Sequence, residues 1–220
     1  MVSKSRILLV EGKADEAFYK EVCRIRELNI DVKVAPPREL GGAFNSKGGV
    51  LDLLPALLNQ LPDGRVERLG VIVDADYKSS NGLGYEETFA RIATLFGQYG
   101  FAHAKDSNSS GAIFKSADNL PDIGLWVMPD NQGEGMLEDW IKKVIINTED
   151  ELMSAAVAAT QSVVQKKFKS IHVAKAEIAT WLAWQEKPGN GLEYTVKMGL
   201  LDLNAQHFSA FSNWLQEIYT

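Results

Sequence analysis

Residues 69–76 have the sequence Leu-Gly-Val-Ile-Val-Asp-Ala-Asp, an apolar run rich in β-branched residues that ends in two aspartates. A short apolar run of this kind is typical of a strand in the interior of a sheet. Asp74 and Asp76 flank one alanine where the predicted strand ends, so both carboxylates should lean to the same side of the sheet. The stretch therefore predicts a buried strand with two acidic side chains at its carboxyl end.

Helical patterns alternate with three further apolar runs in the first two thirds of the chain. Strands that alternate with helices imply a parallel sheet joined by right-handed crossovers, with helices on both faces. We therefore predict an α/β fold with a central, mainly parallel four-stranded sheet flanked by helices. The predicted strands are residues 6–10, 30–35, 69–73 and 123–128, and the predicted helices are residues 14–25, a segment that runs to residue 61, 85–96 and 136–146.

The last third of the chain has a different pattern, because it contains no further predicted strand. We expect an α/β domain over residues 1–147 and a helical C-terminal extension over residues 148–220 that packs on the same core. The helical patterns beyond Asn147 are residues 149–168, 172–186 and 205–219.

The composition indicates an ordinary globular protein, since apolar residues make up 45% of the 220 residues and charged residues 24%. The single cysteine, Cys23, excludes an intrachain disulfide and a zinc site built from cysteines. The longest apolar run near the start, residues 7–10, is too short for a signal peptide or a membrane span. We expect a cytoplasmic protein that does not associate with membranes.

The formal net charge of −6 bears on partners. A protein that simply coats nucleic acid needs a surplus of Lys and Arg, so the charge argues against that class. It leaves open an enzyme that acts on nucleic acid through an acidic site neutralised by a divalent cation. The most basic stretch, residues 166–169, is expected to be a solvated helix end. The motif Ser-Lys-Gly-Gly at residues 46–49 could hold a phosphate on backbone amides, but a flexible loop with a helix start is the favoured interpretation.

Acidic residues follow three of the predicted strands, at Glu11, Asp74 and Asp130. In open parallel sheets, functional groups lie beyond the carboxyl ends of the strands. Asp74 and Asp76 repel each other unless a cation lies between them or one of them takes a proton. A hard cation with oxygen ligands, Mg²⁺ foremost, would remove this repulsion. The alternative is an acidic turn that caps the next helix.

Glu11, which is already in this set, and Glu138 are the two glutamates that could take part in a site. Glu11 could coordinate metal or act as a general acid or base, and its alternative role is to complement the dipole of the following helix. Asp15 is the better candidate for that second role, because it lies in the first turn. Glu138, early in the helix 136–146, could reach a second cation, as in two-metal phosphoryl transfer. A first-turn acid that complements the helix dipole is the alternative for Glu138.

Two segments resemble the motifs of the Toprim domain, a catalytic module of topoisomerases, bacterial primases and OLD-family nucleases. They are residues 8–15, Leu-Leu-Val-Glu-Gly-Lys-Ala-Asp, and residues 71–76, Val-Ile-Val-Asp-Ala-Asp. Residues 125–132, 135–139 and 175–189 look like a bacterial and phage group of Toprim-like proteins of unknown function. This second likeness covers nearly the whole chain, whereas the Toprim likeness covers only the predicted α/β domain.

The resemblance implies a Toprim-like Rossmannoid fold and a set of site residues. Glu11 matches the Toprim glutamate, a metal ligand or general acid/base, and Asp74 and Asp76 match its metal-binding aspartate pair. Glu138 resembles the acid that OLD-type nucleases use for a second metal. Lys175 has the place of a late lysine of those nucleases, which would stabilise transition-state charge. The implied cofactor is Mg²⁺ or Mn²⁺.

The leading prediction is a Mg²⁺-dependent phosphoryl-transfer enzyme that acts on nucleic-acid phosphodiesters, most simply a nuclease. One alternative is a non-catalytic Toprim-like module that acts with a partner protein in phage defence or nucleic-acid metabolism. It is favoured by the absence of the Gly-X-X-X-X-Gly-Lys-Ser/Thr motif of an ATPase and of large DNA-holding domains. A receiver domain is a further alternative, but receivers carry an acidic pair where this chain has Glu11 and Gly12. The substrate, the number of metals, the partner and the oligomeric state stay open.

Overall fold

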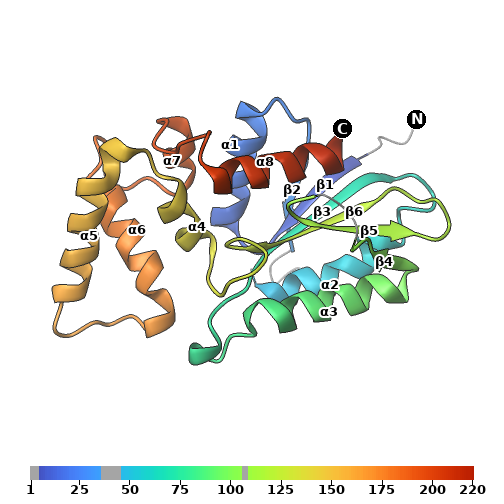
Figure 1. The fold of residues 1–220 in the computed structure, drawn as a ribbon, viewed down its shortest axis with the longest axis horizontal. Helices are drawn as coiled ribbons and strands as arrows, with labels where there is room; N and C mark the ends of the chain where they lie inside the picture. Colours follow the sequence, from blue (N-terminus) through green and yellow to red (C-terminus); the bar gives the residue numbers. More distant parts are fainter. Residues whose placement is uncertain (1–4, 36–45, 106–108) are drawn as a thin grey trace.

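The computed structural model of the protein describes residues 5–35, 46–105 and 109–220. Within these residues, six strands form one mixed sheet with the order β2-β1-β3-β6-β5-β4 (Figure 1). The first four in that order run parallel, and β5 and β4 run antiparallel to their neighbours. The strands are β1 (Ser5–Val10), β2 (Asp31–Val34), β3 (Val66–Asp74), β4 (Phe101–His103), β5 (Ala112–Ser116) and β6 (Ile123–Met128).

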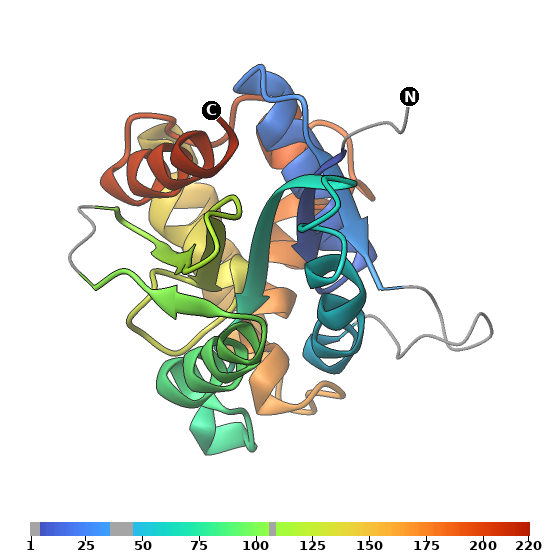
Figure 2. The same cartoon turned by 90° about the vertical axis from the view of Figure 1, so that its right-hand side faces the viewer.

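Helices cover both faces of the sheet, with α1 and α8 on one face and α2 and α3 on the other, as the end-on view in Figure 2 shows. The α5–α6 hairpin lies at one end of the molecule. No helix in the described ranges is long and apolar enough to cross a membrane. The helices are α1 (Lys13–Ile25), α2 (Lys47–Leu58), α3 (Gly84–Gln98), α4 (Leu137–Val144), α5 (Asp150–Ser162), α6 (Val173–Ala183), α7 (Glu193–Lys197) and α8 (Gln206–Tyr219), with short 3₁₀ turns η2 (Lys78–Ser80), η3 (Asn147–Glu149) and η4 (Ser170–His172).

The alternation of side chains along β1 divides the core into two layers. Leu8 and Val10 pack with α1, α4 and α8, whereas Ile7 and Leu9 pack with α2 and α3. All four are at most 3% exposed, since a strand between two helical layers buries both of its faces. This is why the central strands are continuous apolar runs rather than alternating ones.

The C-terminal helix closes over the sheet at a glycine of β3. Tyr219 on α8 donates a hydrogen bond from its hydroxyl to the carbonyl of Ile7. A Cβ atom at Gly70 would lie 2.7 Å from the Tyr219 hydroxyl oxygen, so only glycine permits this close approach. Helices beyond residue 147 thus share the core of the sheet. The proposed division at that residue stays a prediction.

The α/β class is confirmed, but the predicted four-stranded sheet is wrong, because the sheet has six strands. The four predicted strands are present, adjacent and parallel. Of the two additional strands, β4 has only three residues, and β5 begins with only three apolar residues, so neither has the run of about four or more apolar or alternating residues that indicates a strand. Antiparallel pairing of β5 with β6, such as Ala112 with Leu125, gives them their place.

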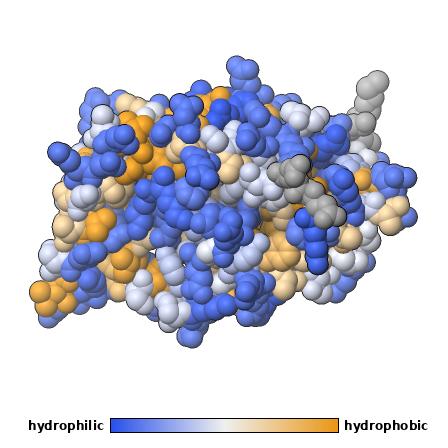
Figure 3. Space-filling view, in the orientation of Figure 1, coloured by the Kyte–Doolittle hydropathy of each residue, from blue (hydrophilic) through white to orange (hydrophobic). Residues whose placement is uncertain are grey.

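The basic stretch at residues 166–169 lies in the loop after α5, not at a helix end, because α5 stops at Ser162. In the same loop Val164 is 96% exposed. Figure 3 shows a largely hydrophilic face, with hydrophobic residues reaching the surface at the far end of the α5–α6 hairpin. The solvated character expected of this stretch is confirmed.

Candidate functional site

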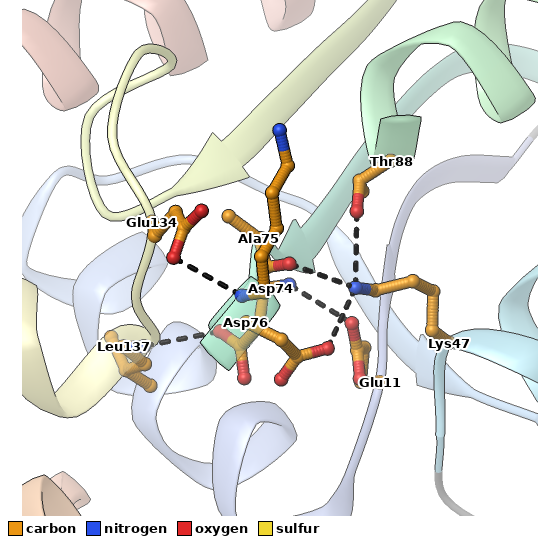
Figure 4. A network of polar contacts seen from close by, with 9 residues as sticks. Glu11, Lys47, Asp74, Ala75, Asp76, Thr88, Glu134 and Leu137 are labelled. Atoms are coloured by element: carbon orange, nitrogen blue, oxygen red, sulfur yellow. Dashed lines mark hydrogen bonds and ion pairs between the residues drawn. The ribbon is translucent and has the colours of Figure 1, made fainter. Parts of the chain in front are cut away.

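Two neighbouring parallel strands bring Glu11 and Asp74 together at their carboxyl ends. Glu11 follows β1 directly, and Asp74 is the last residue of β3. The backbone N–H of Asp74 donates to Oε1 of Glu11 at 2.9 Å (Figure 4). The side chain of Glu11 therefore links the ends of the two strands. The two acids lie at one edge of the sheet, as expected, but the bond between them was not predicted.

Asp76 reaches the same place by a different backbone geometry from the one expected. It lies beyond the strand, with a φ of 63°, and its backbone pairs with Gly135. Aspartate tolerates this left-handed conformation better than most residues. A Cβ atom at Gly82 would lie 2.5 Å from Cβ of Asp76, so the following loop can fold back only because residue 82 is glycine. Figure 4 shows the carboxyl groups of Asp74 and Asp76 turned to the same side.

Glu11, Asp74 and Asp76 form an acidic edge of the sheet. Lys47 supplies a cation to this acidic edge, and the sequence interpretation missed it. Its ammonium nitrogen lies 2.8 Å from Oδ2 of Asp76 and 3.2 Å from the hydroxyl of Thr88. The side chain is only 12% exposed. Lys47 is the first residue of α2, and Ser46 caps that helix by accepting from the N–H of Gly49. The motif at residues 46–49 was the available signal; residues 36–45, with the other part of the glycine-rich loop, lie outside the described residues.

The first turn of α4 contributes Glu138, and its N-terminal backbone meets Asp74. The N–H of Leu137 donates to Oδ1 of Asp74 at 3.1 Å. Glu138 is 8% exposed and forms no ion pair with any residue that the structure describes. Asp139 accepts from the N–H of Met136, so it is the residue that caps α4. Glu138 thus lies beside the aspartates without serving as the cap.

Lys175 extends from α6 toward this acidic group. It is exposed, and within the described part of the chain it makes no hydrogen bond or ion pair. Partial desolvation lowers the pKa of Lys175, but nearby carboxylates, Glu138 foremost and then Asp74, outweigh this and raise it. The C-terminal helices therefore bring a positive charge near the acidic edge. Asp15 lies in the first turn of α1, as expected, and it also accepts from the N–H of Gly12 at 2.9 Å.

Burial sets the protonation of the two central acids. It raises the pKa of Glu11 to about 7, against the opposing effect of the Lys47 charge. Burial also raises the pKa of Asp74 well above its ordinary value, and the charge of Glu11 raises it further. Carboxylates that repel one another in a poorly hydrated place favour a proton or a cation between them. Perturbation of this kind is frequent at functional sites.

The donor atoms suit a hard divalent cation. Glu11, Asp74 and Asp76 each use one carboxylate oxygen in the bonds given above, and the second oxygen of each makes no hydrogen bond to another described residue. An all-oxygen set of this kind fits Mg²⁺ or Mn²⁺ in its chemistry. As the side chains stand, no three His, Cys, Asp or Glu residues of the described ranges are arranged to hold a metal ion.

Asp130, the third acid at a strand end, does not join this group. Its carboxylate lies 2.6 Å from the ammonium of Lys143 and accepts from the N–H of Gly133. It stabilises the loop after β6 rather than the acidic edge. Glu134, in the same loop, accepts from the N–H of Lys78.

No curated protein and no solved structure gives a match to this chain. A family model with the description "Protein of unknown function (DUF3226)" matches residues 5–220, from β1 to the last residue, and so includes every element of the acidic edge. Because the match spans almost the whole sequence, the chain belongs to the DUF3226 family.

Proposed function

We propose that the protein is a Mg²⁺- or Mn²⁺-dependent phosphoryl-transfer enzyme with a Toprim-like site, which acts on nucleic-acid phosphodiesters and is most simply a nuclease. The observation that carries this proposal is the 2.9 Å hydrogen bond between the N–H of Asp74 and Glu11. It joins a proton-exchanging carboxyl group to the aspartate pair at the carboxyl edge of the parallel strands, where α/β proteins carry their reactive groups.

The residues divide the work as follows. Glu11, Asp74 and Asp76 would hold the cation, and Glu138 would hold a second one. The bound cation would polarise the phosphate and lower the pKa of the attacking water. Before a cation binds, burial keeps the pKa of Glu11 at about 7, so this carboxyl group can accept or release a proton near neutral pH. The ammonium of Lys175, an exposed residue of α6, can neutralise charge that develops on the phosphate oxygens.

A second candidate, a non-catalytic module that acts with a partner protein, is favoured by one observation. Lys47 already pairs with Asp76 at 2.8 Å, so part of the acidic edge has a counter-ion from the chain itself. A site retained for its shape would need no further cation. Catalysis would require Asp76 to exchange this ion pair for a metal.

Cleavage of single- and double-stranded DNA and RNA by the purified chain, with Mg²⁺ or Mn²⁺, tests the proposal. Glu11→Gln keeps the acceptor oxygen for the N–H of Asp74 but removes the charge and the proton exchange. We expect activity to fall by about a hundredfold or more, the scale of lost general acid–base catalysis. Glu86→Gln, on the exposed face of α3, is the matched control and should keep full activity.

Equal cleavage by wild type and Glu11→Gln would contradict the proposal, because the activity would then belong to another site or to a contaminant. Absence of cleavage in all variants, with metal bound at Asp74 and Asp76, would favour the non-catalytic module.

A further inference from the structure

A cleft of about 390 Å³ lies between α1, α6 and the turn before α7. Small and aliphatic side chains form most of its wall, among them Ala14 from α1, Ala179 and Leu182 from α6, and Leu192 from the turn. A concave, mainly apolar surface of this size with a few polar groups is the usual form of a small-molecule site. Neither the proposed metal site nor its chemistry uses this wall.

Two charged side chains line the same cleft and give it a polar end. Glu138 is 8% exposed and has no ion pair with a described residue, and only its own backbone N–H and the nearby charge of Lys175 offset the cost of burying its carboxylate. Lys175 is exposed, and its ammonium has no hydrogen-bond or ion-pair partner among the residues that the structure describes. The cleft therefore combines an apolar wall with a buried acceptor and an available cation.

The polar end of the cleft adjoins the acidic edge. The charge of Lys175 interacts with Asp74 and Glu11 as well as with Glu138. Ala14 follows Glu11 by three residues, at the start of α1. A phosphate held at the acidic edge would consequently have its covalent neighbour at the mouth of the cleft.

We infer that this cleft binds the base of an unpaired nucleotide whose phosphate lies at the acidic edge and whose sugar lies at the mouth of the cleft. The inference rests on the proposed function and names its substrate class: single-stranded nucleic acid or a frayed end. A base inside a duplex is stacked and paired, so it can enter a side pocket only after it is unstacked and unpaired, which costs free energy. An unpaired base is free to bury its apolar faces against the alanines and leucines, while Lys175 meets the phosphate.

The test is calorimetric binding of AMP, ribose 5-phosphate and inorganic phosphate to the full chain in Mg²⁺ buffer. AMP should bind about tenfold or more tightly than ribose 5-phosphate, because only AMP carries the group that fills the apolar wall. Ala179→Leu narrows the cleft at an exposed helical position and should weaken AMP binding by about tenfold or more. It should leave the affinity for ribose 5-phosphate and the melting temperature unchanged.

Ala158→Leu, an identical change at an exposed position of α5, is the matched control and should bind AMP as the wild type does. Ala183→Leu on the same wall replaces Ala179→Leu if that variant does not fold. Equal affinities for AMP and ribose 5-phosphate, or an Ala179→Leu protein that binds AMP normally, would overturn the inference. If decanoate displaced AMP at a concentration below that of AMP, the inference would also be overturned, because the cleft would then bind an acyl chain.

These outcomes separate the cleft from the proposed nuclease. If cleavage depended on Glu11 but AMP bound no more tightly than ribose 5-phosphate, the inference about the cleft would be refuted and the proposed enzyme would stand. AMP binding that Ala179→Leu weakens, without cleavage of any nucleic acid, would refute the enzyme and leave the cleft. With both intact, single-stranded substrates should be cleaved faster than duplexes, and Ala179→Leu should reduce that preference.

Discussion

Glu138 on α4 and Glu177 on α6 are both buried glutamates, at 8% and 4% exposed, but their surroundings differ. Glu177 lies 2.8 Å from the ammonium of Lys142. Glu138 has no ion pair with a described residue, and burial raises its pKa although the charge of Lys175 opposes the shift. A buried carboxylate is inexpensive when it is paired and costly when it is not.

The same contrast holds for the two regions around these residues. Where α5 and α6 meet η3, polar groups satisfy one another: Glu149 accepts from the indole N–H of Trp181 and from the amide of Gln185. At the acidic edge, burial raises the pKa of Glu11 and of Asp74, and among the described residues only Lys47 forms an ion pair with this group. The first region stabilises the packing of helices. The second holds carboxyl groups that readily take a proton or a cation, which is useful for binding or catalysis and unfavourable for stability.

The largest effect on stability should be the pH dependence caused by Glu11. Its pKa is about 7 when folded and 4.5 ordinarily, so between these values the folded chain holds a proton that the unfolded chain has released. This contribution is complete below pH 4.5 and is lost as the pH rises through 7, at most about 3 kcal/mol. Urea unfolding in EDTA from pH 4.5 to 8 measures it. Glu11→Gln should reduce the slope, and the slope that remains belongs to Asp74, whose pKa burial also raises. A wild type whose stability increases over this window would contradict the account.

The second-largest effect on stability should come from removing the ion pair between Lys142 and Glu177. Lys142→Met leaves Glu177 buried without its cation and should lower the free energy of unfolding by about 2 kcal/mol, less than for a fully buried pair because the Lys142 side chain is 28% exposed. Glu138→Gln, in the unpaired region, should leave the free energy of unfolding unchanged or raise it. Denaturant titrations of both variants make the comparison. Equal destabilisation by the two changes would show that the regions do not differ.

Mg²⁺ should reduce the repulsion between Asp74 and Asp76 and so stabilise the folded chain. If Asp74 and Asp76 bind Mg²⁺ only when folded, a concentration about ten times the dissociation constant adds about 1.4 kcal/mol to stability. Thermal unfolding with and without Mg²⁺ measures the shift. The Asp74→Asn, Asp76→Asn double variant should lose it, and an equal shift in this variant and the wild type would refute the site.

The smallest effect concerns the ion pair within the chain. Lys47→Met removes the partner of Asp76 and should lower metal-free stability by about 1 kcal/mol, with a larger Mg²⁺-induced shift because Asp76 is then free. Lys13→Met removes an ion pair with Glu16 in which the lysine is 66% exposed, and should change almost nothing. If Lys47→Met left both metal-free stability and the Mg²⁺-induced shift as in Lys13→Met, Lys47 would not be the counter-ion of this edge.

Local pattern was sufficient for the four parallel strands and for the acids at their ends. Continuous apolar runs form the strands that both helical layers bury, and parallel strands necessarily place the residues that follow them at one edge. Glu11 and Asp74 were therefore predictable as neighbours without any knowledge of their contacts. Asp15 was predictable as an acid in the first turn of α1, because that position depends only on where the helix begins. Its bond to the N–H of Gly12 was not predicted.

Contacts between distant segments required the folded chain. Lys47 reaches Asp76 across 29 positions and Thr88 across 41, and nothing in the sequence around Lys47 encodes either distance. The strand β5 exists because β6 offers it an edge, and its five residues carry no pattern of their own. The cleft beside Lys175 likewise depends on how α6 packs against α4 and how α7 packs against α1. Such features follow from the sum of tertiary packing, whereas strands and their ends follow from the order of apolar and polar residues along the chain.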